Sequence, residues 1–523
     1  MKIVFVLIYF LACFSCPAAL PPTTSESSPA SRTLLFVDDD PILYRSGTHR
    51  VFHPFQRHAG NPVIKGKEKP WEIALAWTSV YRNPTTGLYQ LWYQAFAGDR
   101  AKDRTRRCVV CYAESTNGIT FDKPNLGLFD FNGDTNNSIV LIANGGKSDR
   151  YGAAVVVDPL SIDPSRRYKM AYFDFSMDRG REVPGLCVAF SPDGIHWSKH
   201  AAAPLSRAAY GDYGEPVPFQ DEPGREWAVP LSMSDALDAF YDPVRQVFAI
   251  YGKMWIDAPD GGMFWKHGIG RIESRDFVHW SSPQTMLTPA DDDPPHVEFH
   301  TGPAFFYNGC YFNLLQILNR AENGGAIDIE LAVSRDGLAW QRPFKKQFAL
   351  PRGCAGQFDS GSIFTSATPI VLPEEIRFYY GAYSGGATGA DDYSHLSGIG
   401  FATLPKDRFA GLKPVSRSDQ ATLPKPLENI GQITLKPIQM TPGTVLRLNA
   451  DATEGTIRVE LLNEHGYRLR GFSREDALPI EGNSLSHSVK WKDRSLQDLP
   501  AGRYLVRIHL NKAEAFALNL ETN

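Results

Sequence analysis

The stretch that decides the fold runs from His296 to Trp340. It reads HVEFHTGPAFFYNGCYFNLLQIL, then a polar loop, then IELAVSRDGLAW. Two aromatic-rich runs flank Asn308-Gly309, a dipeptide strongly favoured in two-residue hairpin turns. A third run ends in the turn Ser334-Arg335-Asp336-Gly337, and Trp340 follows in a fourth. These features predict one four-stranded antiparallel unit with Glu298 on its first strand.

The same two-part pattern recurs along the chain, always in the same order. Its first part is a hairpin turn that enters an aromatic strand, and its second part is a strand followed by Ser-x-Asp-Gly-x-x-Trp or a relative. The copies are spaced by about 60 to 80 residues, which is typical of large repeats such as propeller blades. The turns begin at Asn83, Asp163, Asp242, Asn308 and Pro373, and the second parts are Ser115–Phe121, Ser191–Trp197, Ser274–Trp280, Ser334–Trp340 and the degenerate Leu404–Phe409.

We therefore predict an all-β chain in which a five-bladed β-propeller is followed by a small C-terminal β-sandwich. The propeller is expected over residues 33–412, a polar linker over 413–430 and the β-sandwich over 431–523. In each blade the Asp-Gly turn closes the outer hairpin and the Trp packs between blades, so Asp193, Asp276 and Asp336 are expected to be structural.

Residues 1–19 begin with a short charged region followed by an apolar run and small residues, which predicts a secretory signal peptide. The alternative is an N-terminal membrane anchor. Residues 20–32 are rich in Pro, Ser and Thr and predict a disordered leader. A secreted or periplasmic location follows. No later apolar run is long enough for a membrane span.

The composition of the chain limits the classes of molecule that it is expected to bind. The chain has 523 residues, a net charge of −4 and 12% aromatic residues. The charge argues against nucleic acid as the main partner, and the aromatic content is compatible with sugar-binding surfaces. Cys108 and Cys111 have metal-like spacing, but residues three apart on a strand point to opposite faces. We expect neither a metal nor another cofactor.

Charged residues cluster where the innermost strand of each predicted blade begins. Those strand ends and the preceding loops reach one mouth of a propeller, so a site there collects residues from several blades. Charged groups in core strands are costly unless they are paired or functional. The candidates are Trp71 and Glu72 in blade one, Arg150 in blade two, Asp235 and Asp238 in blade three, Glu298 and His300 in blade four, and Asp359 in blade five.

Glu298 is the strongest catalytic candidate. It shares a strand face with His300 and lies among Phe299, Phe305 and Phe306. Desolvation there is expected to raise its pKa, as a general acid requires. Several carboxylates meeting in an aromatic setting fit glycoside cleavage, which uses one acid and one base or nucleophile.

Other interpretations stay open for the remaining candidates. Glu72 could instead pair with a nearby lysine such as Lys69, and Asp359 could form an Asx-type turn. Either Asp235 or Asp238 could be the one that faces the channel.

This arrangement resembles the five-bladed propeller glycoside hydrolases of the fructosidase/invertase type (family 32) and the arabinanase/xylosidase type (family 43). By that resemblance Glu72 is a base or nucleophile, Asp238 or Asp235 a stabilising carboxylate and Glu298 the acid. Asp235, His300, Asp359, Trp71 and Arg150 would contact the sugar.

The chain departs from these families in several places. Blade one lacks Asn-Asp-Pro-Asn-Gly and carries Glu rather than Asp, blade three lacks Arg-Asp-Pro, and no Cys directly follows Glu298. A fructan or arabinan specificity therefore does not transfer to this divergent member.

The predicted function is that of a secreted glycoside hydrolase acting on an oligo- or polysaccharide. One alternative is a non-catalytic carbohydrate-binding propeller. Another is a phosphorylase or transglycosidase on the same scaffold, with Arg150 or Arg207 holding an anion. The sugar, the linkage, the stereochemical outcome and the oligomeric state are not encoded in any motif that we recognise.

Overall fold

The computed structural model describes residues 31–145, 151–159, 161–178, 181–200, 205–207, 233–262, 265–322, 324–387, 392–416 and 428–522. The predicted signal peptide lies outside these residues, as does the leader up to residue 30. Helical structure in the described part is limited to short 3-10 turns, and none of its helices could cross a membrane. These turns are η1 (Gly98–Arg100), η2 (Arg104–Arg106), η3 (Pro164–Arg166) and η5 (Leu496–Asp498).

The central part of the chain forms five antiparallel meanders, which we call blades one to five. Blade one holds β6 (Ala74–Arg82), β7 (Tyr89–Phe96), β8 (Cys108–Ser115) and β9 (Ile139–Leu141). Blade two holds β10 (Tyr151–Val157), β11 (Tyr168–Asp178), β12 (Arg181–Ser191), β13 (Ser198–Lys199) and β14 (Ser206–Arg207). Blade three holds β15 (Met233–Asp242), β16 (Val247–Ile256), β17 (Lys266–Ser274) and β18 (Gln284–Leu287).

Blade four contains the predicted Asn-Gly hairpin. It holds β19 (Val297–Phe299), β20 (Ala304–Tyr307), β21 (Cys310–Asn319), β22 (Ala326–Ser334), β23 (Trp340–Gln341) and β24 (Phe348–Leu350). Tyr307 pairs with Cys310 across the hairpin, and Asn308 and Gly309 have φ of 48° and 75°. Positive φ at both central residues is the geometry that Asn-Gly turns favour, so the predicted hairpin is confirmed.

Blade five is completed by the N-terminal part of the chain. It holds β25 (Ser362–Thr365), β26 (Ile370–Val371), β27 (Glu375–Tyr383) and β28 (Ser397–Pro405), and β28 pairs with β4 (Gln56–Arg57) and β5 (Ile64–Lys65). Arg57 and Asn61 anchor this edge, because Arg57 Nε donates to Asp359 at 2.7 Å and Asn61 Nδ2 donates to Phe401 O at 2.9 Å. Segments far apart in sequence thus share one blade.

The repeated turn fastens one blade to the next. Trp92 Nε1 in blade one donates to Gly194 O in the turn of blade two at 2.6 Å. Tyr379 Oη in blade five donates to Gly118 O in the turn of blade one, also at 2.6 Å. Tyr251 of blade three makes the same bond to Gly337 O in blade four. A Cβ on Gly194, whose φ is 82°, would lie 2.6 Å from Trp92, so glycine is required by both backbone and packing.

The aspartate of the same turn holds its backbone. In blade two, Oδ1 of Asp193 accepts hydrogen bonds from the backbone N–H groups of Ile195 and His196, both at 2.8 Å. Asp276 and Asp336 make the equivalent bonds in blades three and four. These contacts agree with the structural role expected for the three aspartates.

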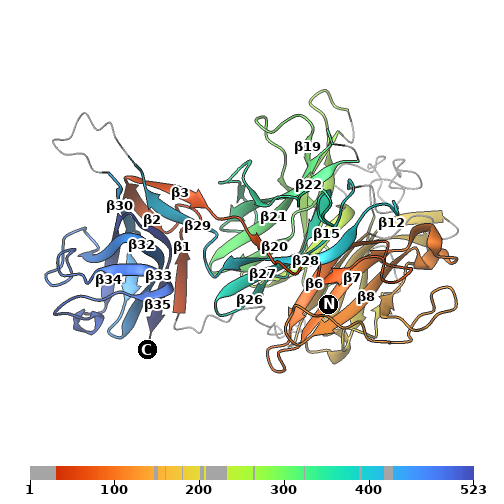
Figure 1. Ribbon diagram of the computed structural model, residues 1–523, viewed down its shortest axis with the longest axis horizontal. Coiled ribbons are helices and arrows are strands. Elements are labelled where there is room, and N and C mark those ends of the chain that lie inside the picture. Colours follow the sequence, from red (N-terminus) through yellow and green to blue (C-terminus); the bar gives the residue numbers. More distant parts are fainter. Residues whose placement is uncertain are drawn as a thin grey trace, which may run out of the picture.

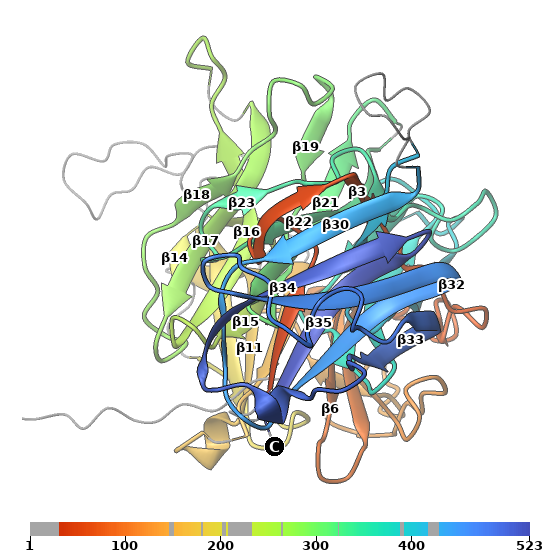
Figure 2. The same ribbon diagram turned by 90° about the vertical axis from the view of Figure 1, so that its left-hand side faces the viewer.

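A separate β-domain forms the other lobe of the molecule, at the left in Figure 1 and toward the viewer in Figure 2. Its ten strands make one hydrogen-bonded sheet, because the long β32 pairs with β35 through its first half and with β34 through its second. The strands are β1 (Ser31–Leu35), β2 (Ile42–Ser46), β3 (Thr48–Phe52), β29 (Ala410–Pro414), β30 (Ile430–Leu435), β31 (Ile438–Met440), β32 (Thr444–Asn463), β33 (Ile480–Ser488), β34 (Gly502–Asn511) and β35 (Glu514–Thr522).

The predicted all-β architecture, a propeller followed by a C-terminal β-domain, is confirmed. The boundaries differ from those expected, because β1, β2 and β3 pair with strands of the C-terminal domain rather than with the propeller. Leu34, Phe36 and Ile42 pack into that domain's own core. The N-terminal segment starts in one lobe and crosses to the other (Figure 1), so a division of the chain into consecutive segments could not show this pairing.

Candidate functional site

Glu298 lies at the start of blade four, and the side chains of His267 and Arg320 hydrogen-bond to its carboxylate. Its Oε2 is 2.5 Å from Nδ1 of His267 in blade three, and its Oε1 accepts from Arg320 Nε at 3.2 Å. Its side chain is 12% exposed. Because β17 and β19 belong to adjacent blades, the contact with His267 joins blade three to blade four.

The electrostatics of this pair differ from the sequence prediction. Burial raises the pKa of Glu298, but the hydrogen bond and charge of His267, together with Arg320, outweigh it and lower the pKa to about 2. Burial and the charge of Lys253 lower the pKa of His267 to about 4. At neutral pH Glu298 is therefore an ionised carboxylate and His267 a neutral imidazole that donates from Nδ1.

Asp235 joins the same cluster through a bulge in β15. The register with β16 shifts between Met233 and Leu237, and the carboxylate of Asp235 forms an ion pair with Lys253. Burial raises the pKa of Asp235, but Lys253 and the charges of His300 and His267 outweigh it and lower the pKa. The side chain is 28% exposed, which leaves this second carboxylate accessible.

His300 occupies the inner side of the cluster. Its Nδ1 lies 2.9 Å from Gln316 Oε1, and since a carbonyl oxygen only accepts, Nδ1 carries the proton. Burial and Lys253 lower the pKa of His300 to about 3. The ring is neutral at physiological pH, with Nδ1 committed to Gln316.

Two tryptophans flank the histidines. Trp77 has φ of 29° at a bulge in β6, and its ring centroid lies 6.0 Å from His300 and 4.8 Å from Phe364. A positive φ at a bulky residue is uncommon and marks a local constraint. Trp255 packs against His267 with ring centroids 3.7 Å apart. Blades one, three, four and five thus contribute to one polar cluster with aromatic walls.

Asp238, which was predicted to be catalytic, bonds to backbone on the inner strands. Its Oδ1 accepts from Ala239 N–H at 2.7 Å and its Oδ2 from Ala367 N–H of blade five at 2.9 Å. It is 4% exposed. Burial raises its pKa to about 7, although the two backbone hydrogen bonds oppose this shift. Of the two aspartates whose orientation was open, Asp235 is the one that pairs with Lys253 and feels the charges of His300 and His267.

Glu72 and Trp71 pack inside blade one. Glu72 is fully buried and accepts from Tyr93 Oη at 2.7 Å and from Lys123 Nζ at 2.8 Å. The lysine pairing considered from the sequence therefore exists, with Lys123 rather than Lys69 as the partner. Trp71 is 1% exposed, and its ring lies 5.3 Å from that of Phe131. None of the described contacts of Glu72 reaches Glu298 or Asp235.

Asp359 accepts from Arg57 Nε and from Tyr380 Oη at 2.9 Å, and it is 1% exposed. It ties the N-terminal strands to blade five. Arg150 lies outside the described residues, and the side chain of Arg207 is not described either.

Five residues of the cluster were not predicted from the sequence. A signal existed for Lys253, a charge inside the otherwise apolar and aromatic run Val247–Ile256, and for Trp255 two residues later on the same strand face. His267 and Arg320 follow no motif, and their proximity to Glu298 arises from the packing of adjacent blades. The five are Trp77, Lys253, Trp255, His267 and Arg320.

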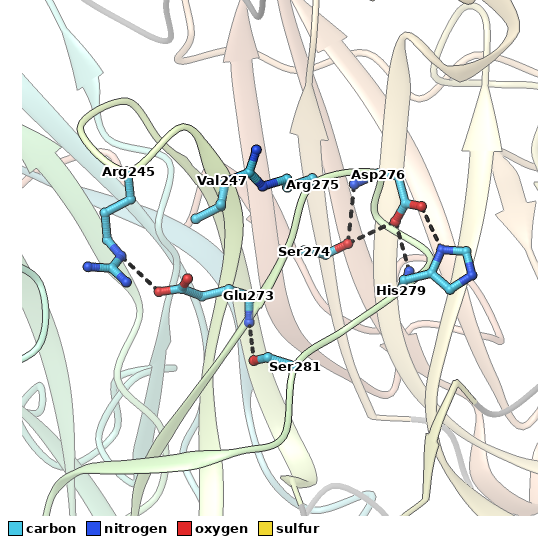
Figure 3. A pocket seen from close by; sticks show the side chains of 8 residues that line it. All are labelled: Arg245, Val247, Glu273, Ser274, Arg275, Asp276, His279 and Ser281. Atoms are coloured by element: carbon cyan, nitrogen blue, oxygen red, sulfur yellow. Dashed lines mark hydrogen bonds and ion pairs between the residues drawn. The ribbon is translucent and has the colours of Figure 1, made fainter. Parts of the chain in front are cut away.

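No group of three or more metal-ligating side chains occurs among the described residues. A surface hollow of about 640 Å³ lies on the outside of blade three (Figure 3). There Arg245 points toward Glu273 at 2.9 Å, and Asp276 toward His279 at 2.6 Å. Because these groups brace the hairpin and the repeated turn, the hollow is a property of the scaffold.

No protein-family model and no curated protein matches the chain. Among solved structures, a glycoside hydrolase is 14% identical over 72% of this chain and 96% of its own, with a TM-score of 0.45. A glycosyl hydrolase from Bacteroides ovatus is 16% identical over 68% and 95%, with a TM-score of 0.43. A fructofuranosidase from Schwanniomyces occidentalis complexed with fructosylnystose is 11% identical over 90% and 97%, with a TM-score of 0.40.

Proposed function

We propose that the protein is a secreted glycoside hydrolase whose working carboxylates are Glu298 and Asp235. One observation carries the proposal. Asp235 and Glu298 come from adjacent blades, where Asp235 pairs with Lys253 and Glu298 with His267, and the two neutral histidines of the cluster each lie beside a tryptophan. Paired carboxylates in a partly desolvated aromatic setting are what glycoside cleavage requires.

The charge states assign the roles in the unliganded protein. With a pKa of about 2, Glu298 is ionised and suited to act as a base or nucleophile. The acid role expected from the sequence requires its pKa to rise when a substrate excludes water and displaces Arg320, whose side chain is 41% exposed. Asp235, ionised beside Lys253, is the partner carboxylate. Because glycoside cleavage needs a protonated acid as well as an ionised base or nucleophile, one of the two carboxylates must take up a proton from solvent when the substrate binds.

The other predicted residues take supporting roles in this proposal. Glu72, Asp238 and Asp359 keep the blades in register through their buried bonds to Lys123, Ala367 and Arg57. Trp71 fills the core of blade one. His300 orients a sugar hydroxyl, and Arg150 remains a predicted substrate contact. Secretion rests on the apolar run within residues 1–19.

A substrate screen tests the proposal. The purified protein is incubated with aryl glycosides of common pyranoses and furanoses and with plant and microbial polysaccharides, with and without inorganic phosphate. Release of reducing sugar without phosphate is the expected result. Retention of a polysaccharide with no cleavage would instead indicate a binding propeller, and turnover that needs phosphate would indicate a phosphorylase.

A further inference from the structure

Arg320 contacts Glu298 through only one of its three guanidinium nitrogens. Nε donates to Oε1 of Glu298 at 3.2 Å, whereas neither Nη1 nor Nη2 donates a hydrogen bond to any of the described residues. The side chain is 41% exposed. Nη1 and Nη2 form a planar fork of N–H donors, and because all three nitrogens are bonded to one carbon, this free fork lies next to the Glu298 carboxylate.

The position of Arg320 is fixed by its backbone. Its N–H donates to His296 O at 2.9 Å, two residues before Glu298. The turn after β21 is therefore bonded to the segment that enters β19. A group that is already positioned loses less conformational freedom when it binds a ligand.

The acid that follows Arg320 in the chain does not compete for its fork. Glu322 accepts from both Nη atoms of Arg352, at 2.5 and 2.8 Å, and from Asn319 Nδ2 at 2.9 Å. Among the described residues, Glu298 is the only acid that pairs with Arg320. The charge of the guanidinium is thus shared with a single carboxylate, through a single nitrogen.

The charges of the cluster balance without a ligand. Asp235 and Glu298 are negative, Lys253 and Arg320 are positive, and the two histidines are neutral. A ligand with one negative charge therefore meets no net repulsion from these side chains, and it can pair with the free fork. A neutral sugar would cover the same N–H groups with hydroxyl oxygens, which accept weaker hydrogen bonds than a carboxylate does.

We propose that the glycan bound in this site carries a carboxylate, as a hexuronic acid does, and that the Nη1–Nη2 fork of Arg320 binds it while Nε stays on Glu298. The inference rests on the proposed function, which places the glycan at Glu298. One planar group then holds both carboxylates and sets the position of the sugar relative to Glu298. Glu298 stays ionised, as a base or nucleophile requires. The substrate class is an acidic oligo- or polysaccharide, and Arg320 determines that specificity.

Calorimetry with pairs of sugars that differ in one carboxylate tests the inference. Galacturonate is compared with galactose, glucuronate with glucose and mannuronate with mannose, because a monosaccharide has no glycosidic bond to cleave. Inorganic phosphate is titrated in the same way. At least one uronate should bind at least about tenfold more tightly than its neutral counterpart, since only the uronate offers a charged acceptor to the fork.

Variants of Arg320 show whether this residue causes the preference. Arg320→Met should abolish it, and Arg320→Lys, which keeps the charge but not the fork, should keep only part of it. Arg470→Met removes an exposed arginine from the C-terminal domain, and this matched control should leave the preference unchanged.

The outcomes separate the acidic ligand from the hydrolase. Equal affinity within every pair, absence of binding by all six sugars, or a preference that survives Arg320→Met would overturn the inference. Tighter binding of phosphate than of every uronate would also overturn it. Cleavage of a neutral glycan in the substrate screen would then still support the hydrolase. A preference that depends on Arg320, in a protein that cleaves no substrate, would support the acidic ligand while overturning the proposed hydrolase.

Discussion

His267 of blade three and Glu298 of blade four share a 2.5 Å contact between Nδ1 and Oε2, and the backbone N–H of His267 points to the same oxygen at 3.3 Å. The contact fixes the imidazole as the Nδ1–H tautomer and the carboxylate as the acceptor. It also makes the charge of Glu298 depend on a residue from another blade. His267 is thus a positioning residue whose effect is measurable as a pH dependence.

Replacing His267 by Leu should move the acid limb of the pH profile of kcat/KM to higher pH. Loss of a hydrogen bond to a charged group is worth about 1.5–3 kcal/mol, or roughly one to two pH units. The acid limb moves upward because the proposed base or nucleophile is the ionised form of Glu298, whose lowered pKa would rise in the variant. His267→Asn keeps a donor near Nδ1 and should shift the limb less. An acid limb that stays at the wild-type position in both variants would contradict this role.

Asp238 should make the stability of the fold fall as pH rises. Its folded pKa of about 7 lies above the ordinary value of 3.8, so the folded state binds the proton more tightly. The stabilisation is complete below pH 3.8 and is lost as pH rises through 7. Asp238→Asn cannot ionise, so urea unfolding should show a smaller deficit for this variant at about pH 9 than at about pH 5. A deficit that grows with pH would contradict the assignment.

Glu72→Gln should weaken the fold rather than the chemistry. The change breaks a buried pair with Lys123, although Glu68 still contacts that lysine at 3.1 Å, so a loss of roughly 2–4 kcal/mol is expected. Urea unfolding measures the loss, and kcat of the folded fraction should stay near that of the wild type. A collapse of kcat with unchanged stability would return Glu72 to the catalytic role predicted from the sequence.

Gly194→Ala should test the turn that fastens blades one and two. Left-handed backbone alone costs an alanine about 1–2 kcal/mol, and the new Cβ would also meet Trp92 at 2.6 Å. Gly261 is the matched control, because its φ is 86° but a Cβ added there would meet no atom within 4 Å. Thermal unfolding should show a loss for Gly194→Ala that is at least about twice the loss for Gly261→Ala. Equal losses would mean that the contact with Trp92 contributes nothing.

Much of the fold could be predicted because short sequence patterns specify the turns and strands of the blades. Asn308 and Gly309 specify their hairpin because both residues adopt positive φ. The turn that begins at Ser191 is specified by the hydrogen bonds that Asp193 accepts from the backbone. The pairing of β1, β2 and β3 with the C-terminal domain could not be predicted. It joins residues at opposite ends of the chain, such as Ser31 and Glu521, and no local signal encodes such a contact.

The candidate site could be predicted only in part, for a similar reason. The cost of charges in core strands selects Glu298 and Asp235 as candidates, and the same rule also selects Glu72, which is buried and paired. Burial was expected to raise the pKa of Glu298. Its lowered pKa depends instead on His267 and Arg320, neither of which neighbours it in sequence.

Turnover by Glu298→Gln is the most direct measurement of the central claim. The change removes the charge but preserves the shape, and His267 and Arg320 remain in place. With a substrate identified by the screen, we expect kcat/KM to fall by at least about a thousandfold, which corresponds to roughly 4 kcal/mol. Circular dichroism should match the wild type, whereas the unfolding midpoint should fall, because the lowered pKa of Glu298 means that its charge stabilises the fold. Turnover within a few fold of the wild type by a folded Glu298→Gln protein would contradict the account.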